Sequence, residues 1–149
     1  MRIIVQRCER AQVEVENKIV GKIDKGIMLL VGFTHTDTEK EIDYLVNKVL
    51  NLRIFDDENG VMNKSVLDTN GSILSISQFT LYADARKGNR PSYINALNGE
   101  KAIVLYDKFN EKLKEKIHVE TGIFGAEMKV DFINDGPITI TLEKEHENV

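Results

Sequence analysis

Hydrophobic and polar positions in the first quarter of the chain follow the pattern of β-strands. Residues 3–7 and 11–15 predict two short strands, the second with apolar and polar side chains in clean alternation. Asn17 predicts a turn into a third strand, Lys18 to Ile23, and the apolar run IMLLVGF at 27–33 is typical of a central strand covered on both faces. Because the connections between these strands are short, we expect antiparallel pairing.

The periodicity changes to a helical one after this run. Thr38 followed by Glu41 matches a capping box, in which a hydroxyl and a carboxylate satisfy the first free amides of a helix. Apolar residues at helical spacing then predict a face directed at a core: Ile42, Leu45, Val46, Val49 and Leu50. A second helix with one apolar face is predicted at about Gly99 to Lys116.

The remaining pattern predicts further strands. Arg53 to Phe55 is a candidate short strand, and Ser72 to Tyr82 (SILSISQFTLY) is a candidate long strand. Two more are predicted near the end of the chain, Met128 to Ile133 and Ile138 to Leu142, on either side of Asn134-Asp135-Gly136-Pro137. The elements together predict an α+β fold with a curled antiparallel sheet, a barrel-like core and two main helices.

Length and composition indicate one globular domain spanning residues 1–149, in which the charged segment 143–149 is expected to fray. The longest mostly apolar run, Gly26 to Phe33, is too short to span a bilayer. The opening MRIIVQRCER has no uninterrupted apolar core, so we expect no signal peptide and a cytoplasmic location. The net charge of −4 argues against indiscriminate nucleic-acid binding, and any contact with RNA must use a local patch such as residues 86–90 (RKGNR).

The side chains that most enzymes use are scarce. The single cysteine, Cys8, excludes an internal disulfide and is expected to pack as a small hydrophobic residue. The three histidines have no metal-ligand spacing and are expected to be structural or exposed: His35, His118 and His146. No GxSxG elbow, phosphate-binding loop or dinucleotide fingerprint is present in the sequence.

Two short stretches offer alternatives to a purely structural interpretation. On a strand, Gln78 and Thr80 of SQFTL share one face, and the Thr80 hydroxyl could either bind or attack a carbonyl. Because no neighbouring base would activate it, a binding or polarising role is chemically easier. The segment Asn134 to Pro137 is either a tight turn or, with a cis Gly136-Pro137 bond, a rigid pair of carbonyls that forms a binding surface.

Taken together, these stretches resemble the D-aminoacyl-tRNA deacylase family, also called D-tyrosyl-tRNA deacylases. The similarity runs from MRIIVQR to NDGPITI, and its specific motifs are SQFTL at 77–81 and NDGP at 134–137, in this order and at this separation. Further matching stretches are SQFTLYAD, RKGNRPSY and VETGIFGAEM. Ala83 and Cys8 are mild departures, since glycine and valine are frequent there in the family.

The resemblance implies a homodimer with active sites at the subunit interface and no metal ion or organic cofactor. In the pattern of the family, a pocket of one subunit is formed by Ser77, Gln78, Phe79 and Thr80, with Met128 nearby. A cis Gly136-Pro137 pair enters that pocket from the other subunit, with Asn134 in the same motif, and Arg7 is implied to brace that loop. The expected substrate is the 3′ end of D-aminoacyl-tRNA.

The residues leave several points open. Hydrolysis could be driven by the Thr80 hydroxyl or assisted by the vicinal 2′-hydroxyl of the RNA, which we favour because no side-chain base adjoins Thr80. Residues 86–93 (RKGNRPSY) are either a structural loop or a phosphate contact through Arg86, Lys87 and Arg90. The alternatives to the enzyme are a non-catalytic RNA-end-binding or peptide-binding dimer of the same fold, and a hydrolase of another activated ester.

Overall fold

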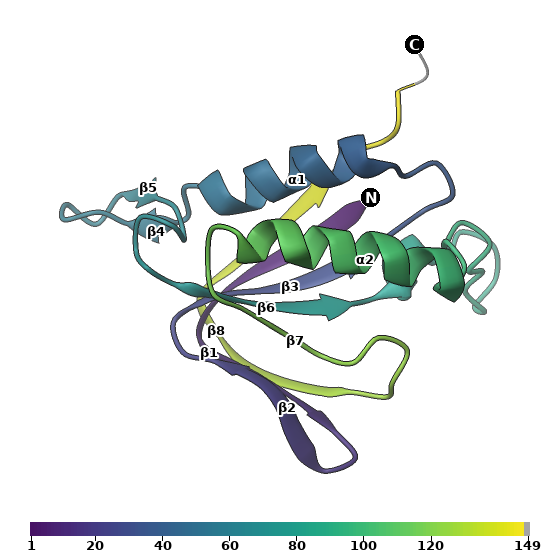
Figure 1. Ribbon diagram of the computed structural model, residues 1–149, viewed down its shortest axis with the longest axis horizontal. Coiled ribbons are helices and arrows are strands. Elements are labelled where there is room, and N and C mark those ends of the chain that lie inside the picture. The colour runs from purple at the N-terminus through teal and green to yellow at the C-terminus, as the bar shows by residue number, and fades with distance from the viewer. Residues whose placement is uncertain (148–149) are drawn as a thin grey trace.

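Two helices cover one face of a strongly curled sheet in the computed structural model, which describes residues 1–147 (Figure 1). In chain order its elements are β1 (Arg2–Val15), β2 (Lys18–Ile23), β3 (Gly26–Gly32), α1 (Glu39–Asn51), β4 (Phe55–Asp56), β5 (Met62–Lys64), β6 (Ser72–Ser77), the 3-10 helix η1 (Phe79–Tyr82), α2 (Gly99–Lys114), β7 (Val119–Thr121) and β8 (Lys129–Glu143). The α+β class, the curled sheet and the two main helices predicted from the sequence are confirmed.

The sheet is mixed rather than wholly antiparallel. Within residues 1–147 its strand order is β2-β1-β3-β6-β7, and β8 pairs with β1. The pairings of β1 with β2, β3 and β8 are antiparallel, as expected for the short connections, whereas β3–β6 and β6–β7 are parallel. Parallel neighbours need a long crossover. The helices α1 and α2 lie within those two crossovers, a feature that the local pattern does not reveal.

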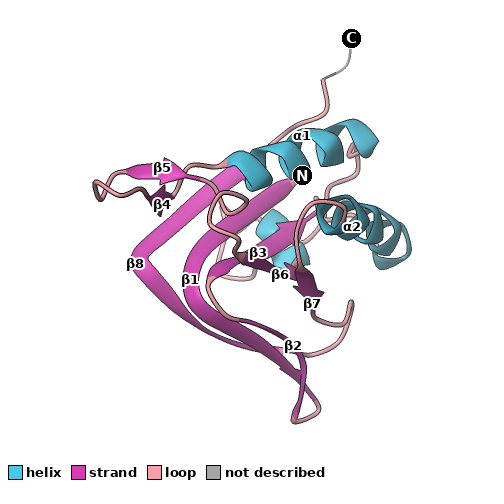
Figure 2. Ribbon diagram, turned by 60° about the vertical axis from the view of Figure 1, so that its left-hand side comes forward, coloured by secondary structure: helices cyan, strands magenta, loops and turns pink. Residues whose placement is uncertain are grey.

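The two longest strands differ from the prediction. The segments 3–7 and 11–15 are parts of a single strand, β1, and the two strands expected around NDGP are parts of β8. The tight-turn interpretation of residues 134–137 is therefore wrong, because the chain bends there and continues along β1 (Figure 2). Register shifts on either side of Cys8 mark the place where the pairing accommodates this bend.

The core lies between the helices and the sheet. Thr38 and Glu41 form the predicted capping box, and the apolar face of α1 packs with that of α2 against β1, β3 and β6. A smaller apolar cluster fills the other side of the curled sheet and includes Cys8, which is fully buried as predicted. Burial raises the pKa of the Cys8 thiol to about 11.

The C-terminal segment follows β8 towards the start of the chain. The amide of Lys144 donates to the Met1 carbonyl, and His146 Nδ1 lies 2.8 Å from the Glu41 carboxylate at the start of α1. Residues 148–149 of the expected frayed tail lie outside the described residues. No helix within residues 1–147 has the length and apolar character needed to cross a membrane.

Candidate active site

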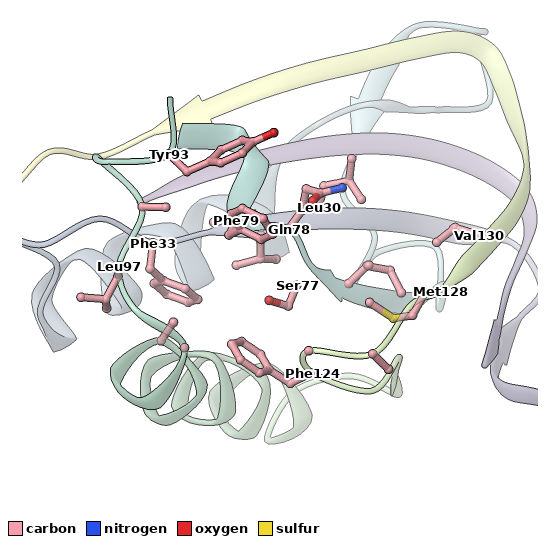
Figure 3. Close-up of a pocket in the computed structure, with 18 residues that line it drawn as sticks. Leu30, Phe33, Ser77, Gln78, Phe79, Tyr93, Leu97, Phe124, Met128 and Val130 are labelled. Carbon is pink, nitrogen blue, oxygen red and sulfur yellow. The ribbon is translucent and has the colours of Figure 1, made fainter. Parts of the chain in front are cut away.

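A pocket of about 540 Å³ opens where the parallel strands β3 and β6 end (Figure 3). The end of β3, the end of β6 and the first turn of α2 form part of its wall, through Phe33, Ser77 and Gly99. The loop between β7 and β8 completes the opposite wall with Phe124 and Met128, together with Val130 of β8. Ligands of sheet proteins commonly bind at the carboxyl ends of parallel strands, so this pocket is the primary candidate site.

Three residues of the SQFTL motif line this pocket: Ser77, Gln78 and Phe79. They do not share the strand geometry predicted for them, because β6 ends at Ser77 and the chain then turns into η1. The last bond to the neighbouring strand runs from the Gln78 amide to the Val31 carbonyl, at 2.8 Å. The predicted alternation of faces through residue 82 is therefore wrong, since a 3-10 turn replaces the second half of the strand.

A glycine on β3 allows this turn to pack closely. A Cβ atom on Gly32 would lie 2.8 Å from the Gln78 carbonyl oxygen and 3.0 Å from the Leu81 Cβ atom. Both separations are closer than ordinary van der Waals contact, so only glycine at this position lets η1 lie directly on β3. The position of Gln78 and Phe79 at the pocket thus depends on a residue that the sequence motifs do not include.

Thr80 occupies a different place from the other three motif residues. Its side chain is exposed on η1, and it is not among the residues that line the pocket. The amides of Phe79 and Thr80 stand at the start of η1, where a helix provides no carbonyl acceptor for its first N–H groups. Within a single chain, the Thr80 hydroxyl therefore takes no part in the pocket wall.

An aromatic pair stands at the rim of the pocket. Phe79 and Tyr93 meet edge to face with ring centroids 5.2 Å apart, and about half of each side chain is exposed (Figure 3). The segment that carries Tyr93 is tied to the end of β3, because Thr34 Oγ1 donates to the Asn95 carbonyl at 2.6 Å and the Leu97 amide donates to the Phe33 carbonyl at 3.0 Å. The rim is therefore held in place by backbone anchors.

The pocket wall offers little acid–base chemistry. None of the residues within 1–147 that line it carries a carboxylate, an imidazole, an ammonium, a guanidinium or a thiol, and its polar side chains come from Ser77, Gln78 and Tyr93. Ser77 is half-buried near the centre of the view in Figure 3. A reaction in a pocket with this lining would have to rely on positioning, exclusion of water and backbone hydrogen bonds, because the lining supplies no side-chain base.

The second motif lies apart from this pocket in the same chain. The Gly136-Pro137 bond is cis, and both residues are exposed at the bend of β8. Neither residue lines the pocket of its own chain, whereas Met128, the residue directly before β8, does. One chain therefore brings Ser77, Gln78, Phe79 and Met128 together but leaves the Gly-Pro pair outside.

Arg7 and Asn134 support the bend. Arg7 Nε donates to the Asp135 carbonyl at 3.1 Å and Arg7 Nη1 to the Ile54 carbonyl at 2.8 Å, so its guanidinium ties the bend to the segment before β4. Asn134 accepts from the Ile138 amide through Oδ1 at 3.1 Å and donates through Nδ2 to Gln6 at 2.9 Å. Both side chains are engaged within the chain, which places them behind the Gly-Pro pair.

Several pocket residues were missed in the sequence. Phe33, Leu97 and Phe124 supply much of its apolar wall, and Tyr93 supplies the rim. Tyr93 and Phe124 lie in the matching stretches RKGNRPSY and VETGIFGAEM, which were the only signals for them. Phe33 and Leu97 lie on separate segments, and no local spacing relates them.

The remaining reactive groups lie elsewhere. His35 Nε2 is 2.7 Å from the Ile94 carbonyl, and His118 Nε2 is 3.5 Å from Glu120. Residues 1–147 contain no group of three or more histidine, cysteine, aspartate or glutamate side chains that could hold a metal ion.

Comparisons with known proteins show which family this chain belongs to. Residues 4–143 match the model of the family described as D-Tyr-tRNA(Tyr) deacylase. A D-aminoacyl-tRNA deacylase of Brevibacillus brevis (strain 47) is 57% identical over 144 residues, which cover 96% of this chain and 99% of the relative. A protein of the same name from Bacillus velezensis is 55% identical over 96% of this chain and 98% of its own.

A solved structure named c-Myc DNA Unwinding Element Binding Protein superposes with a TM-score of 0.93 at 42% identity, covering 98% of this chain and 100% of the other. The match of the family model to nearly the whole chain and the identity of the curated relatives are both far above what a shared fold alone produces. The chain belongs to the D-Tyr-tRNA(Tyr) deacylase family.

Proposed function

We propose that this protein is a hydrolase that cleaves the ester bond of D-aminoacyl-tRNA and releases the free D-amino acid and tRNA. The observation that carries the proposal is the agreement of residues 4–143 with the family model, together with relatives 55–57% identical that are named for this activity. The pocket fits the role, because its motif residues lie at its wall and its interior is large enough for a small polar group and an aromatic ring.

The chemistry of the substrate suits a pocket without a side-chain base. An aminoacyl ester of a ribose carries a vicinal 2′-hydroxyl group that can assist its own hydrolysis. The protein then needs to hold the carbonyl, order a water molecule and stabilise the developing oxyanion. We assign the oxyanion contact to the backbone amides of Phe79 and Thr80 and the assistance to the 2′-hydroxyl of the RNA.

We further propose that the site is completed by a second copy of the chain. The Gly136-Pro137 pair is exposed and supported from behind by Arg7, yet it faces no pocket in its own chain. Among the described strands β8 pairs with β1 alone, so its other edge is available along fifteen residues. A symmetric homodimer would satisfy that edge and deliver Gly136 and Pro137 to the partner's pocket.

Discrimination between D- and L-aminoacyl esters follows from backbone carbonyls that stand beside the Cα atom of the substrate. The carbonyls of Gly136 and Pro137 would clash with an L side chain and accept hydrogen bonds from the α-ammonium group, while a D side chain points to solvent. A hydrophobic pocket cannot achieve such discrimination, because its selectivity for one methylene group is about 10–200-fold. Since glycine has no side chain to clash, glycyl-tRNA is expected to be cleaved as well, and complete resistance of glycyl-tRNA would contradict this role of the carbonyls.

The first experiment compares D-tyrosyl-tRNA and L-tyrosyl-tRNA with the wild-type protein and the Gly136→Ala variant. Rapid release of D-tyrosine alone, lost or relaxed in the variant, is the expected result. Cleavage of neither ester would favour the non-catalytic RNA-end-binding dimer. Equal cleavage of a small D-aminoacyl ester and of D-aminoacyl-tRNA would favour a hydrolase of other activated esters.

The composite site is tested by subunit complementation. Phe79→Ala impairs the pocket and Gly136→Ala impairs the inserted pair, and the two variants are co-refolded in equal amounts. Half of the dimers are then mixed, and each mixed dimer contains one site in which both contributions are intact, so about a quarter of wild-type activity should return. A mixture no more active than the two variants measured separately would refute the exchange between subunits.

A further inference from the structure

A basic loop projects beside the N-terminal end of α2 (Figure 1). We define it as residues 85–91, which are closed at their base by reciprocal hydrogen bonds between the backbones of Asp84 and Ser92, both of 2.8 Å. The chain contains 24 acidic residues, but none lies between Ala85 and Gly99. A protein with net charge −4 therefore presents a local acid-free segment next to its pocket.

The three cations of this loop are not equivalent. Arg86 is engaged by Asp84, whose carboxylate accepts from the Arg86 amide at 3.0 Å, from Nε at 2.9 Å and from Nη2 at 2.7 Å. The hydrogen bonds from Arg86 lower the pKa of Asp84 to about 2, so this pair stays ionised and neutral overall. Lys87 and Arg90 are exposed, and neither makes a hydrogen bond or an ion pair to another side chain within residues 1–147.

The loop is tied to the rim of the pocket. Arg90 precedes the rim residue Tyr93 by three residues, so the Cα atoms of the two residues can be at most about 10 Å apart. The backbone that follows Tyr93 is anchored to the residues after β3, because the Asn95 and Ile94 carbonyls contact Thr34 and His35. Lys87 and Arg90 thus belong to the same loop segment that leads into the exposed aromatic pair of Phe79 and Tyr93. Cations combined with exposed aromatic rings are typical of surfaces that bind single-stranded nucleic acid.

We propose that Lys87 and Arg90 bind the two backbone phosphates that immediately precede the terminal adenosine in the single-stranded CCA end of the tRNA. This inference rests on the proposed function, which places the esterified terminal ribose in the pocket. The next two phosphates of the strand then leave the pocket over its rim, within reach of the loop. We assign no phosphate to Arg86, because its charge is already neutralised by Asp84, which accepts from its Nε and Nη2.

The test uses the double variant Lys87→Ala/Arg90→Ala and three substrates: D-tyrosyl-tRNA, the D-tyrosyl ester of the trinucleotide CCA, and the D-tyrosyl ester of adenosine. The trinucleotide contains both phosphates and no duplex, and the adenosine ester contains neither phosphate. We expect kcat/KM to fall about tenfold for tRNA and for CCA and to stay within about twofold for adenosine. The dependence of log kcat/KM on log salt should become shallower by about 1.4, or about 0.7 for each phosphate contact.

The matched control is Lys18→Ala/Lys22→Ala, which removes the same charge from exposed positions on β2. Four results would each overturn the inference. These are an equal loss of kcat/KM in the control variant, a loss of kcat/KM confined to full-length tRNA, an equal loss with the adenosine ester, and no loss with any substrate. If the wild-type protein cleaves all three esters, the proposed function holds and the variants test the phosphate contacts alone. If the wild-type protein cleaves none of them, the proposed function itself is wrong.

Discussion

Replacing Gly32 with alanine should impair catalysis more than it impairs folding. The added Cβ atom would lie 2.8 Å from the Gln78 carbonyl oxygen, and ordinary van der Waals contact begins at 3.4 Å. Because the Cβ position is fixed by the backbone of β3 and the oxygen belongs to the backbone that leads into η1, neither can rotate away, and η1 must move from β3 by about 0.6 Å. That movement carries with it the amides of Phe79 and Thr80, to which we assign the oxyanion contact.

Two magnitudes follow from this displacement. Overpacking of this kind costs about 1–3 kcal/mol of stability, which corresponds to a decrease in Tm of roughly 3–9 °C for a chain of this length. A displacement of 1 Å in a catalytic arrangement costs about 100-fold in rate, so a shift of about 0.6 Å should lower kcat on D-tyrosyl-tRNA by roughly tenfold. The loss should appear in kcat rather than in KM, since the amides act on the transition state.

Gly21 provides the matched control. A Cβ atom there would lie 2.7 Å from the Thr121 carbonyl oxygen, so Gly21→Ala introduces a similar backbone clash between β2 and β7, away from η1. Thermal unfolding and steady-state deacylation would be measured for both variants under the same conditions. Our reasoning is refuted if Gly32→Ala keeps wild-type kcat, or if the two variants lose activity in proportion to their loss of Tm.

Three further predictions concern buried polar groups. Arg7→Met removes the donors to the Ile54 and Asp135 carbonyls and should lower the free energy of unfolding in urea by about 2–4 kcal/mol, with Arg7→Lys intermediate; a change below about 0.5 kcal/mol would contradict the bracing role. Burial tends to raise the pKa of Glu41, but hydrogen bonds at the start of α1 outweigh it and lower the pKa to about 2. The wild-type protein should therefore lose about 3 kcal/mol more stability than Glu41→Gln as the pH falls from about 4.5 to about 2, and parallel pH profiles would disprove the assignment. Cys8 is fully buried with a pKa of about 11, so an aromatic disulfide reagent at pH 8 should modify it at a rate limited by unfolding, not at that of an exposed thiol.

Local periodicity predicted those elements whose causes are local. The capping box of α1 and the bounds of β2 follow from neighbouring residues, and both were predicted correctly. The second helix begins at the predicted Gly99 and ends two residues earlier than expected, at Lys114. Each of these features is decided within one or two turns of chain, which is the range over which a sequence pattern acts.

The predictions were wrong where the secondary structure is determined by pairing with a strand that is distant in the sequence. Residues 134–137 have the composition of a turn, yet β1 runs alongside both flanking segments and keeps them in one strand. Residues 78–82 continue the alternation of β6, but β3 ends at Gly32 and leaves no neighbour with which they could pair. In both places the partner strand is far away in the sequence, so local propensity was overruled by tertiary structure.

Local pattern raised SQFTL and residues 134–137 only as alternatives to structural stretches, and the resemblance was needed to join them into one site. The chemistry of the site explains why. A catalytic histidine or carboxylate can be recognised in a sequence by its residue type, whereas we assign the chemistry of this pocket to backbone amides and carbonyls, which occur throughout the chain. What distinguishes Phe79, Thr80 and Gly136 is where the backbone places them, and that depends on Gly32, on Arg7 and on the path of β8. Substitutions at these supporting positions should therefore affect activity as strongly as substitutions in the motifs, although none of them touches the substrate.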